Sequence, residues 1–354
     1  MSLVNKIDIK KIRLNKEYCL QGVNKDILIN SSGINLELKS LSSIRILSNL
    51  EPIKTIIDYY PELRILNLTG SLNLAKLLGS KKSKEYGNYL KTSIEDSLKL
   101  ITNYHTEIFP IRKKCYQNLS QVLMNDNALE LPLYNHAGIT GRTSITKGFN
   151  FLTMKKENRK LLKSRNNNCL VEVDFKSCEP FFYLKSNNYS LDETRDIYQW
   201  ISENYNVNIK SRDKFKRGIL SMLYGANEYT TSKVMQIDLS TVKKIKQELG
   251  INSLKDRLTE EYEKNNFILN YYGRPITSNN NLVNYWIQSS TVDFCSLAFY
   301  NFYNHYKLKP CFFIHDSMTF EIEKNRIDML KNIKAIKEPK SNISIPVEFN
   351  ILTE

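Results

Sequence analysis

Two aspartates follow segments that are rich in β-forming residues. Asp174 comes after the run CLVEV, and Asp316 comes after CFFIH. An aspartate at a strand end is most often a turn former, but two on neighbouring strands could meet and hold two divalent cations. Such cations serve nucleotidyl transfer, because one lowers the pKa of an attacking hydroxyl and both stabilise the transferring phosphoryl group. Mg²⁺ needs few carboxylates besides water and phosphate oxygens, so we expect two Mg²⁺ ions, with Mn²⁺ as a substitute.

A basic stripe is expected along one helix. In the segment SRDKFKRGILSMLYGAN, the residues Arg212, Lys216, Leu220 and Tyr224 recur every four positions. At ~100° per residue they drift only ~40° at each step, so they share one side of the helix. The two cations could grip a triphosphate, and Leu220 and Tyr224 could receive a base. The alternative is an amphipathic surface helix with a solvated basic edge.

The elements that would position these side chains can be read from the pattern. We expect a buried strand over Cys169–Phe175, a strand, tight turn and strand over Cys311–Ile322, and a helix over Ser211–Tyr224. The apolar spacing from Tyr89 to about Leu123 predicts a long helical hairpin with its corner at Pro110.

Composition narrows the class of protein. The chain has 354 residues, 41% of them hydrophobic, with only 12 glycines and 9 prolines, which excludes disordered and collagen-like classes. No apolar run approaches the ~18 residues of a membrane span, and we expect no secretory leader because the first residues lack an apolar core. The net charge of +14 favours a polyanionic partner, nucleic acid first, over an ordinary charged surface.

The six cysteines and four histidines do not suggest a metal site. No cysteine pair forms C-x-x-C, no cysteine flanks a histidine at ligand spacing, and the histidines are dispersed. We therefore expect reduced thiols and a cytoplasmic protein. A viral protein in a host cytoplasm fits equally, and an organelle stays open.

Six segments together resemble the family A DNA polymerases, the group of DNA polymerase I and the mitochondrial and phage replicases. They occur in the family's order over roughly residues 135–322. The segments are the helix pattern R-x-x-x-K ending in Y-G, VDFKSCE with Asp174, IHDS with Asp316, TGRTSITKGFNFL (Thr140–Leu152), GRPI (Gly273–Ile276) and NYWIQSSTVDF (Asn284–Phe294). The resemblance is to a short phage or plasmid form without an exonuclease domain, since the first 100 residues contain no D-x-E.

The resemblance implies roles for the catalytic residues. Asp174 and Asp316 would carry the two metal ions, with the backbone carbonyl of Phe175 as a further ligand. Glu179 would be a steric gate that closes the space of a ribose 2′-OH. Lys216 would contact the triphosphate and protonate the leaving pyrophosphate.

Other positions would bind the substrates. Arg212 would hold the triphosphate, Leu220 would face the sugar and triphosphate, Tyr224 would back the nascent base pair, and His315 would lie beside the primer end. The residues implied for primer–template binding are Arg142, Asn150, Arg274, Asn284 and Gln288.

The sequence also departs from the family pattern. Ser317 stands where the family has Glu, Leu220 replaces an aromatic residue, and Pro180 follows the gate in place of Leu. The HDS triplet and the aliphatic Leu220 resemble single-subunit phage-type RNA polymerases. Those enzymes carry a small residue at the gate, whereas this chain keeps Glu179.

These observations predict an α+β fold of the right-hand polymerase type, with an antiparallel palm sheet. We expect a small N-terminal α/β module over residues 1–80, a reduced helical thumb over 81–130, palm over 131–191 and 265–354, and helical fingers over 192–264.

The expected function is primer-extending, template-directed DNA synthesis from dNTPs without proofreading. The alternatives are an RNA-synthesising polymerase of the same fold, primase-like or transcribing, and a non-catalytic nucleic-acid-binding relative. The expected partners are primer–template DNA and dNTPs, with a processivity factor or replisome protein as a further candidate and no membrane.

Overall fold

The structure is a computed structural model that describes residues 100–353 apart from 102, 137, 167 and 266. The chain forms two compact units, one of Met1–Phe109 with Asp256–Asn280 and one of Pro110–Lys255 with Asn281–Glu354. The module expected over residues 1–80 lies outside the described residues, and the domain boundaries inferred from the sequence stay predictions. Within the described residues, no helix has the length and apolar character that crossing a membrane requires.

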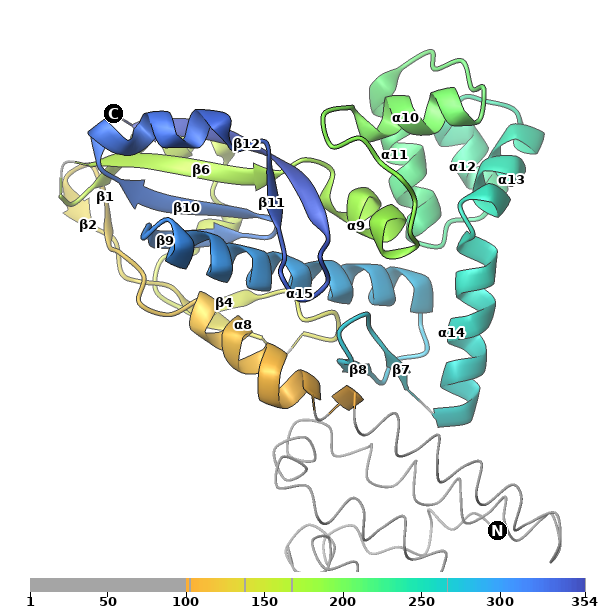
Figure 1. The fold of residues 1–354 in the computed structure, drawn as a ribbon, viewed down its shortest axis with the longest axis horizontal. Coiled ribbons are helices and arrows are strands. Elements are labelled where there is room, and N and C mark those ends of the chain that lie inside the picture. Colours follow the sequence, from red (N-terminus) through yellow and green to blue (C-terminus); the bar gives the residue numbers. More distant parts are fainter. Residues whose placement is uncertain (1–99, 102, 137, 167, 266, 354) are drawn as a thin grey trace, which may run out of the picture. The chain divides into compact units, whose positions relative to one another are not determined.

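A five-stranded antiparallel sheet forms the centre of the second unit (Figure 1). The strands, in spatial order, are β11 (Ala335–Lys337), β12 (Ser344–Thr353), β6 (Cys169–Phe175), β10 (Ser317–Ile322) and β9 (Lys309–Ile314). The strand predicted over Cys169–Phe175 is confirmed, and so is the strand, turn and strand predicted within Cys311–Ile322. The fold of this unit is therefore a mixed α and β fold with an antiparallel sheet.

One face of this sheet packs against the long helix α15 (Leu282–His305), which is buried over most of its length. Because side chains alternate along a strand, Phe175 points to this face while its neighbour Asp174 points to the other. The ring of Phe175 lies 5.4 Å from Phe294 and 4.9 Å from Phe299. This aromatic layer fixes the end of β6 on a rigid support.

The opposite face is covered near its far end by a second apolar cluster. A small sheet contributes Val122 and Leu162, and the ring of Phe151 stacks on Phe312 of β9 with centroids 4.1 Å apart. The covering elements are β1 (Val122–Met124), β2 (Asn127–Ala128), β5 (Leu162–Ser164) and two 3₁₀ turns (Phe151–Thr153, Lys156–Leu161). A separate hairpin joins β3 (Leu133–Asn135) to β4 (Ser144–Lys147). This apolar cluster does not include the end of the sheet that carries Asp174.

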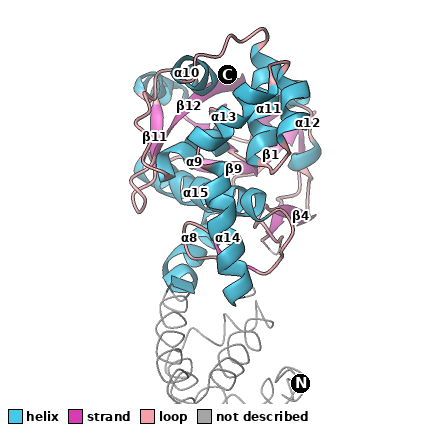
Figure 2. Cartoon of the chain, turned by 90° about the vertical axis from the view of Figure 1, so that its right-hand side faces the viewer, coloured by secondary structure: helices cyan, strands magenta, loops and turns pink. Residues whose placement is uncertain are grey.

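Five helices follow β6 and gather beside that end of the sheet (Figures 1 and 2). They are α9 (Cys178–Ser186), α10 (Ile197–Asn204), α11 (Arg212–Leu223), α12 (Glu228–Met235) and α13 (Leu239–Glu248). Helix α11 confirms the predicted helix, and Ser211 caps it by accepting a hydrogen bond from the Lys214 N–H. A Cβ on Gly218 would lie 2.0 Å from Cγ of Met235, so glycine permits the close packing of α11 on α12.

The helical hairpin predicted up to Leu123 is wrong over its last part. A π-helical turn (Tyr104–Ile108) leads into α8 (Phe109–Cys115), and Pro110 is the second residue of α8 rather than a corner. Asn118 adopts a left-handed conformation after the helix, and Val122 then pairs with β5. The apolar spacing that suggested a helix is used by a strand, because pairing with β5 buries Val122. The part of this prediction before residue 100 lies outside the described residues.

The described part of the first unit contains most of α14 (Ile251–Asn265) and the hairpin β7 (Ile268–Leu269) to β8 (Pro275–Ile276). The turn of the hairpin needs glycine. Gly273 has a φ of +88°, and a Cβ there would lie 2.5 Å from the carbonyl oxygen of Leu100.

A buried ion pair ties α8 to α15 within the second unit. Arg112 Nη1 lies 2.8 Å from Asp293 Oδ1, and both side chains are 0% exposed. Arg112 also donates to the carbonyl oxygen of Gly141. The pair thereby holds the loop that carries Arg142.

We expect Arg112→Ala to lower the free energy of unfolding by about 3–5 kcal/mol, because it leaves a buried carboxylate without its cation. The matched control is Lys163→Ala, whose partner Asp126 is 80% exposed; an exposed pair contributes only about 0–1 kcal/mol. Urea unfolding monitored by circular dichroism measures both. Equal losses in the two variants would contradict a structural role for the buried pair.

Candidate active site

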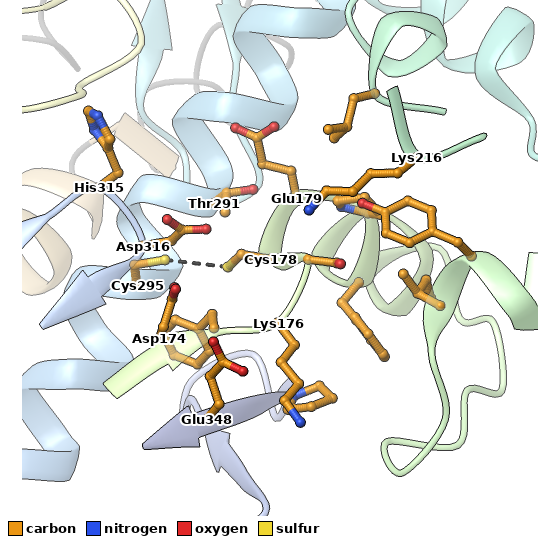
Figure 3. A pocket seen from close by; sticks show the side chains of 18 of the residues that line it. Asp174, Lys176, Cys178, Glu179, Lys216, Thr291, Cys295, His315, Asp316 and Glu348 are labelled. Carbon is orange, nitrogen blue, oxygen red and sulfur yellow. Dashed lines mark hydrogen bonds between the residues drawn. The ribbon is translucent and has the colours of Figure 1, made fainter. Parts of the chain in front are cut away.

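A cavity of about 810 Å³ opens where β6 ends and α9 begins, and its lining comes entirely from the second unit (Figure 3). The structure brings most of the residues predicted from the sequence together in this cavity. Those that line it are Arg142, Asp174, Phe175, Glu179, Arg212, Lys216, Leu220, Tyr224, His315 and Asp316.

The two aspartates lie on adjacent strand ends. Asp174 is opposite Ser317 in the β6–β10 register, and Asp316 lies in the turn between β9 and β10. His315 takes the left-handed conformation (φ 54°) that this tight turn requires. The Phe175 N–H donates to the Asp316 carbonyl oxygen at 3.2 Å, which brings the two chain segments side by side. Both carboxylates extend into the cavity.

The two carboxylates interact unfavourably in the absence of a cation. Burial, followed by the charge of Asp316 and then that of Glu172, raises the pKa of Asp174 from 3.8 to about 7. Burial likewise raises the pKa of Asp316. Within the part of the chain that the structure describes, neither carboxylate forms an ion pair.

The donor set suits a hard divalent cation such as Mg²⁺. A cation between the two carboxylates would offset both the burial and the neighbouring negative charge that raise the Asp174 pKa. Among residues 100–353, with the gaps noted above, no group of three or more His, Cys, Asp or Glu side chains is arranged around a metal position. The protein would therefore supply two carboxylates, and water and phosphate oxygens would fill the other positions, as Mg²⁺ accepts. The role of the Phe175 carbonyl stays a prediction.

Glu179 is held by two side chains from different segments. Arg142 Nη2 donates to Oε1 at 2.8 Å, and the Tyr224 hydroxyl donates to Oε2. Burial and the charge of Glu179 raise the pKa of Tyr224, so its hydroxyl keeps its proton. Pro180 fits directly after Glu179 because it lies in the first turn of α9, where a backbone N–H has no partner in the helix.

Arg212 and Lys216 project from α11 over the ring of Tyr198. The Arg212 Cζ lies 5.5 Å and the Lys216 Nζ 6.0 Å from the ring centroid. Arg212 also donates through Nε to Asp196 at 3.2 Å. Asp196 in turn caps α10 by accepting from the N–H groups of Tyr198 and Gln199, both at 3.0 Å.

Sequence reasoning missed several residues of this cavity. Asp196 could have been found only as a helix cap, since an aspartate precedes the apolar spacing of α10. No sequence motif marks Tyr198 or Glu348 as a residue of the cavity. Tyr198 lines it because of the position of helix α10, and Glu348 lines it because β12 pairs with β6 and brings Glu348 opposite Asp174. Cys178 and Cys295 also line the cavity.

Four residues predicted to bind primer–template do not line the cavity. Asn150 lines a second cavity of about 730 Å³ together with Phe149 and Lys155. Asn284 and Gln288 lie in the first turns of α15. Arg274 belongs to the first unit. Their roles stay predictions.

The raised pKa of Asp174 predicts how stability depends on pH. The folded protein keeps this proton up to about pH 7, whereas the unfolded chain releases it near 3.8. Stability without metal should therefore fall as the pH rises between these values. Asp174→Asn should raise the free energy of unfolding at pH 8 by roughly 1–3 kcal/mol, allowing for partial exposure of the carboxyl group.

Thermal and urea unfolding at pH 4 and pH 8, in chelator, measure this effect. Asp328→Asn, which changes a carboxylate that is 82% exposed, is the control and should leave the pH dependence unchanged. Adding Mg²⁺ at pH 8 should raise the free energy of unfolding of the wild type by more than it raises that of Asp174→Asn. If Asp174→Asn is less stable than the wild type at pH 8 without metal, the prediction that the charged Asp174 destabilises the folded protein is wrong.

No protein-family model matches this sequence, and no curated protein matches it. Among solved structures, the chain is similar to the POL domain of Pol1 from M. smegmatis, whose structure is a complex with DNA primer-template and dNTP. The identity is 12%, the TM-score is 0.48, and the match covers 92% of this chain and 71% of the other. The function proposed below rests on the geometry of the cavity.

Proposed function

We propose that this protein is a template-directed DNA polymerase that transfers a nucleotidyl group from a dNTP to a primer 3′-OH and releases pyrophosphate. One observation carries the proposal. A single cavity has two unpaired carboxylates, Asp174 and Asp316, on its sheet side and two cations, Arg212 and Lys216, on its helix side. The first pair suits divalent cations, and the second suits a triphosphate.

The carboxylates would bind Mg²⁺. When bound, the ions would lower the pKa of the primer hydroxyl and stabilise charge on the phosphoryl group. Asp174 and Asp316 would fix where that charge is stabilised, because Asp174 lies in β6 and Asp316 lies in the turn between β9 and β10 of the same sheet. His315, next to Asp316 in the turn, would lie beside the primer end.

Arg212 and Lys216 would hold the triphosphate from the other side. Arg212 already donates to Asp196 through one edge of its guanidinium, and arginine has five N–H donors. It can therefore keep this orienting contact while other N–H groups face a phosphate. Lys216 would also donate a proton to the leaving pyrophosphate.

Glu179 would select the sugar. Because Arg142 and Tyr224 donate to its two carboxylate oxygens, the side chain is oriented from both sides and would meet a ribose 2′-OH in that orientation. Leu220, between Lys216 and Tyr224 on α11, would contact the sugar with an apolar side chain.

Asp174→Asn and Asp316→Asn should each lower primer extension by at least about a hundredfold, since loss of a metal ligand removes several kcal/mol of transition-state stabilisation at ~1.4 kcal/mol per tenfold. Primer–template binding should change little. Extension of a labelled primer on a defined template, with gel-shift binding, measures both, and Asp328→Asn is the control. Near-wild-type extension by either variant would overturn the assignment of the metal site.

Glu179→Ala should raise the use of rNTPs relative to dNTPs by about tenfold or more, because it opens the space of the 2′-OH. Tyr224→Phe removes one of the two donors to Glu179 and keeps the aromatic ring, so it should shift the ratio in the same direction by less. Extension with matched rNTP and dNTP sets, with and without primer, measures the ratio.

The same assay separates the alternative functions. Equal use of rNTPs and dNTPs by the wild type would favour an RNA-synthesising polymerase. Binding of primer–template without incorporation from either set would indicate a non-catalytic nucleic-acid-binding protein.

A further inference from the structure

The basic side chains that line the active-site cavity differ in whether a carboxylate already binds them. The arginines of the lining are all in ion pairs, namely Arg142 with Glu179, Arg195 with Glu203 and Arg212 with Asp196. Lys176 and Lys216 line the same cavity, and neither forms an ion pair with any residue that the structure describes. Lys176 therefore offers the cavity a positive charge that the proposed function does not use.

Lys176 extends from a fixed point of the backbone. It follows Phe175, the last residue of β6, and α9 begins two residues later. Its N–H donates to the carbonyl oxygen of Pro346 in β12 at 2.8 Å, so the sheet holds the main chain there. The residue itself is exposed. The long side chain can therefore move, while strand pairing sets its origin two residues after Asp174.

The two lysines enter the cavity from different elements. Lys216 comes from α11, one turn after Arg212, whereas Lys176 comes from the end of β6. Figure 3 shows Lys216 beside Glu179 and Lys176 extending on the side of Glu348. A chain of phosphates bound near the carboxylates would therefore meet positive charge from the helix and from the sheet.

Two further carboxylates of the cavity lining could compete for Lys176. Glu193 is already bound to Lys185 at 3.3 Å and accepts a hydrogen bond from the Ser344 hydroxyl at 3.0 Å. Glu348 is exposed and forms no ion pair with Lys176. The ammonium group of Lys176 therefore keeps its charge available for an anion that enters the cavity.

We propose that Lys176 binds the terminal phosphate of the incoming dNTP and keeps contact with the pyrophosphate that forms from it, an inference that rests on the proposed function. Metal ions at Asp174 and Asp316 would hold the reacting phosphoryl group beside those carboxylates, so the rest of the triphosphate would extend away from them. A lysine suits that end, because its ammonium group is a point charge on a flexible stem and can follow a moving phosphate. The contact is ionic, and no bond of Lys176 forms or breaks.

Binding can be measured without DNA synthesis. With Mg²⁺ but no primer–template, calorimetric titration gives the dissociation constants of inorganic tripolyphosphate, a dNTP and the matching dNDP. Lys176→Ala should raise those of tripolyphosphate and the dNTP at least about tenfold, as expected when a contact to a charged group is lost. The dNDP lacks the terminal phosphate and should lose much less affinity. Lys176→Arg keeps the charge and should retain most of the affinity for the dNTP.

The matched control is Lys147→Ala. It also removes one positive charge, but from a side chain that is 74% exposed and does not line the cavity, so all three dissociation constants should stay unchanged. Equal affinity of the wild type and Lys176→Ala for tripolyphosphate, or equal losses for the dNTP and the dNDP, would overturn the proposal. Lys176→Gln repeats the test if the alanine variant does not fold.

Primer extension gives a second readout. Lys176→Ala should raise KM for the dNTP and the pyrophosphate concentration that halves extension, each by about tenfold, and should change kcat little, because the contact is made before and after the chemical step. Weaker primer–template binding in a gel shift, with KM for the dNTP unchanged, would assign Lys176 to the DNA backbone and overturn the proposal. Failure of the wild type to extend primers would contradict the proposed function, whereas the tripolyphosphate titration would still decide whether Lys176 binds phosphate.

Discussion

The repulsion between Asp174 and Asp316 is the constraint on which the rest of the site depends. Antiparallel pairing of β6 with β10 fixes where both carboxylates lie. Burial raises the pKa of each carboxyl group, and the charge of Asp316 raises that of Asp174 further. The sheet can hold this arrangement because its opposite face packs Phe175 against the aromatic side chains of α15. The apolar face therefore stabilises a polar face that is unfavourable without a cation.

Three arginines of the second unit form ion pairs with carboxylates other than Asp174 and Asp316. Arg142 is bound to Glu179 and Arg212 to Asp196, while the buried Arg112 is bound to Asp293. If any of these arginines paired with Asp174 or Asp316, it would neutralise the charge that a metal ion needs. These separate partners leave Asp174 and Asp316 without an ion pair among the described residues, which suits the metal-bound triphosphate of the proposed function.

The sequence was informative where structure is local. Strand β6, the β9–β10 turn and helix α11 follow from short-range patterns. The bounds of β6 match the prediction, and those of β9 and α11 differ from it by one or two residues. The position of Glu348 opposite Asp174 and the contact of Cys178 with Cys295 depend on segments that are far apart in the chain, so no spacing reveals them. The helix predicted through Leu123 failed for the same reason, because pairing of β1 with the distant β5 overrode a helical spacing.

The position of β6 in the sheet has a consequence for how the molecule is made. Both of its neighbours, β10 and β12, lie far later in the sequence, so Asp174 leaves the ribosome on a strand whose two edges have nothing to pair with. Unpaired edges are templates for wrong pairing, and sheets built from distant segments form slowly. During synthesis, α9 and the helices that follow it are available before those strands are. The five-stranded sheet is then completed only when β12, the last strand of the described chain, has been synthesised.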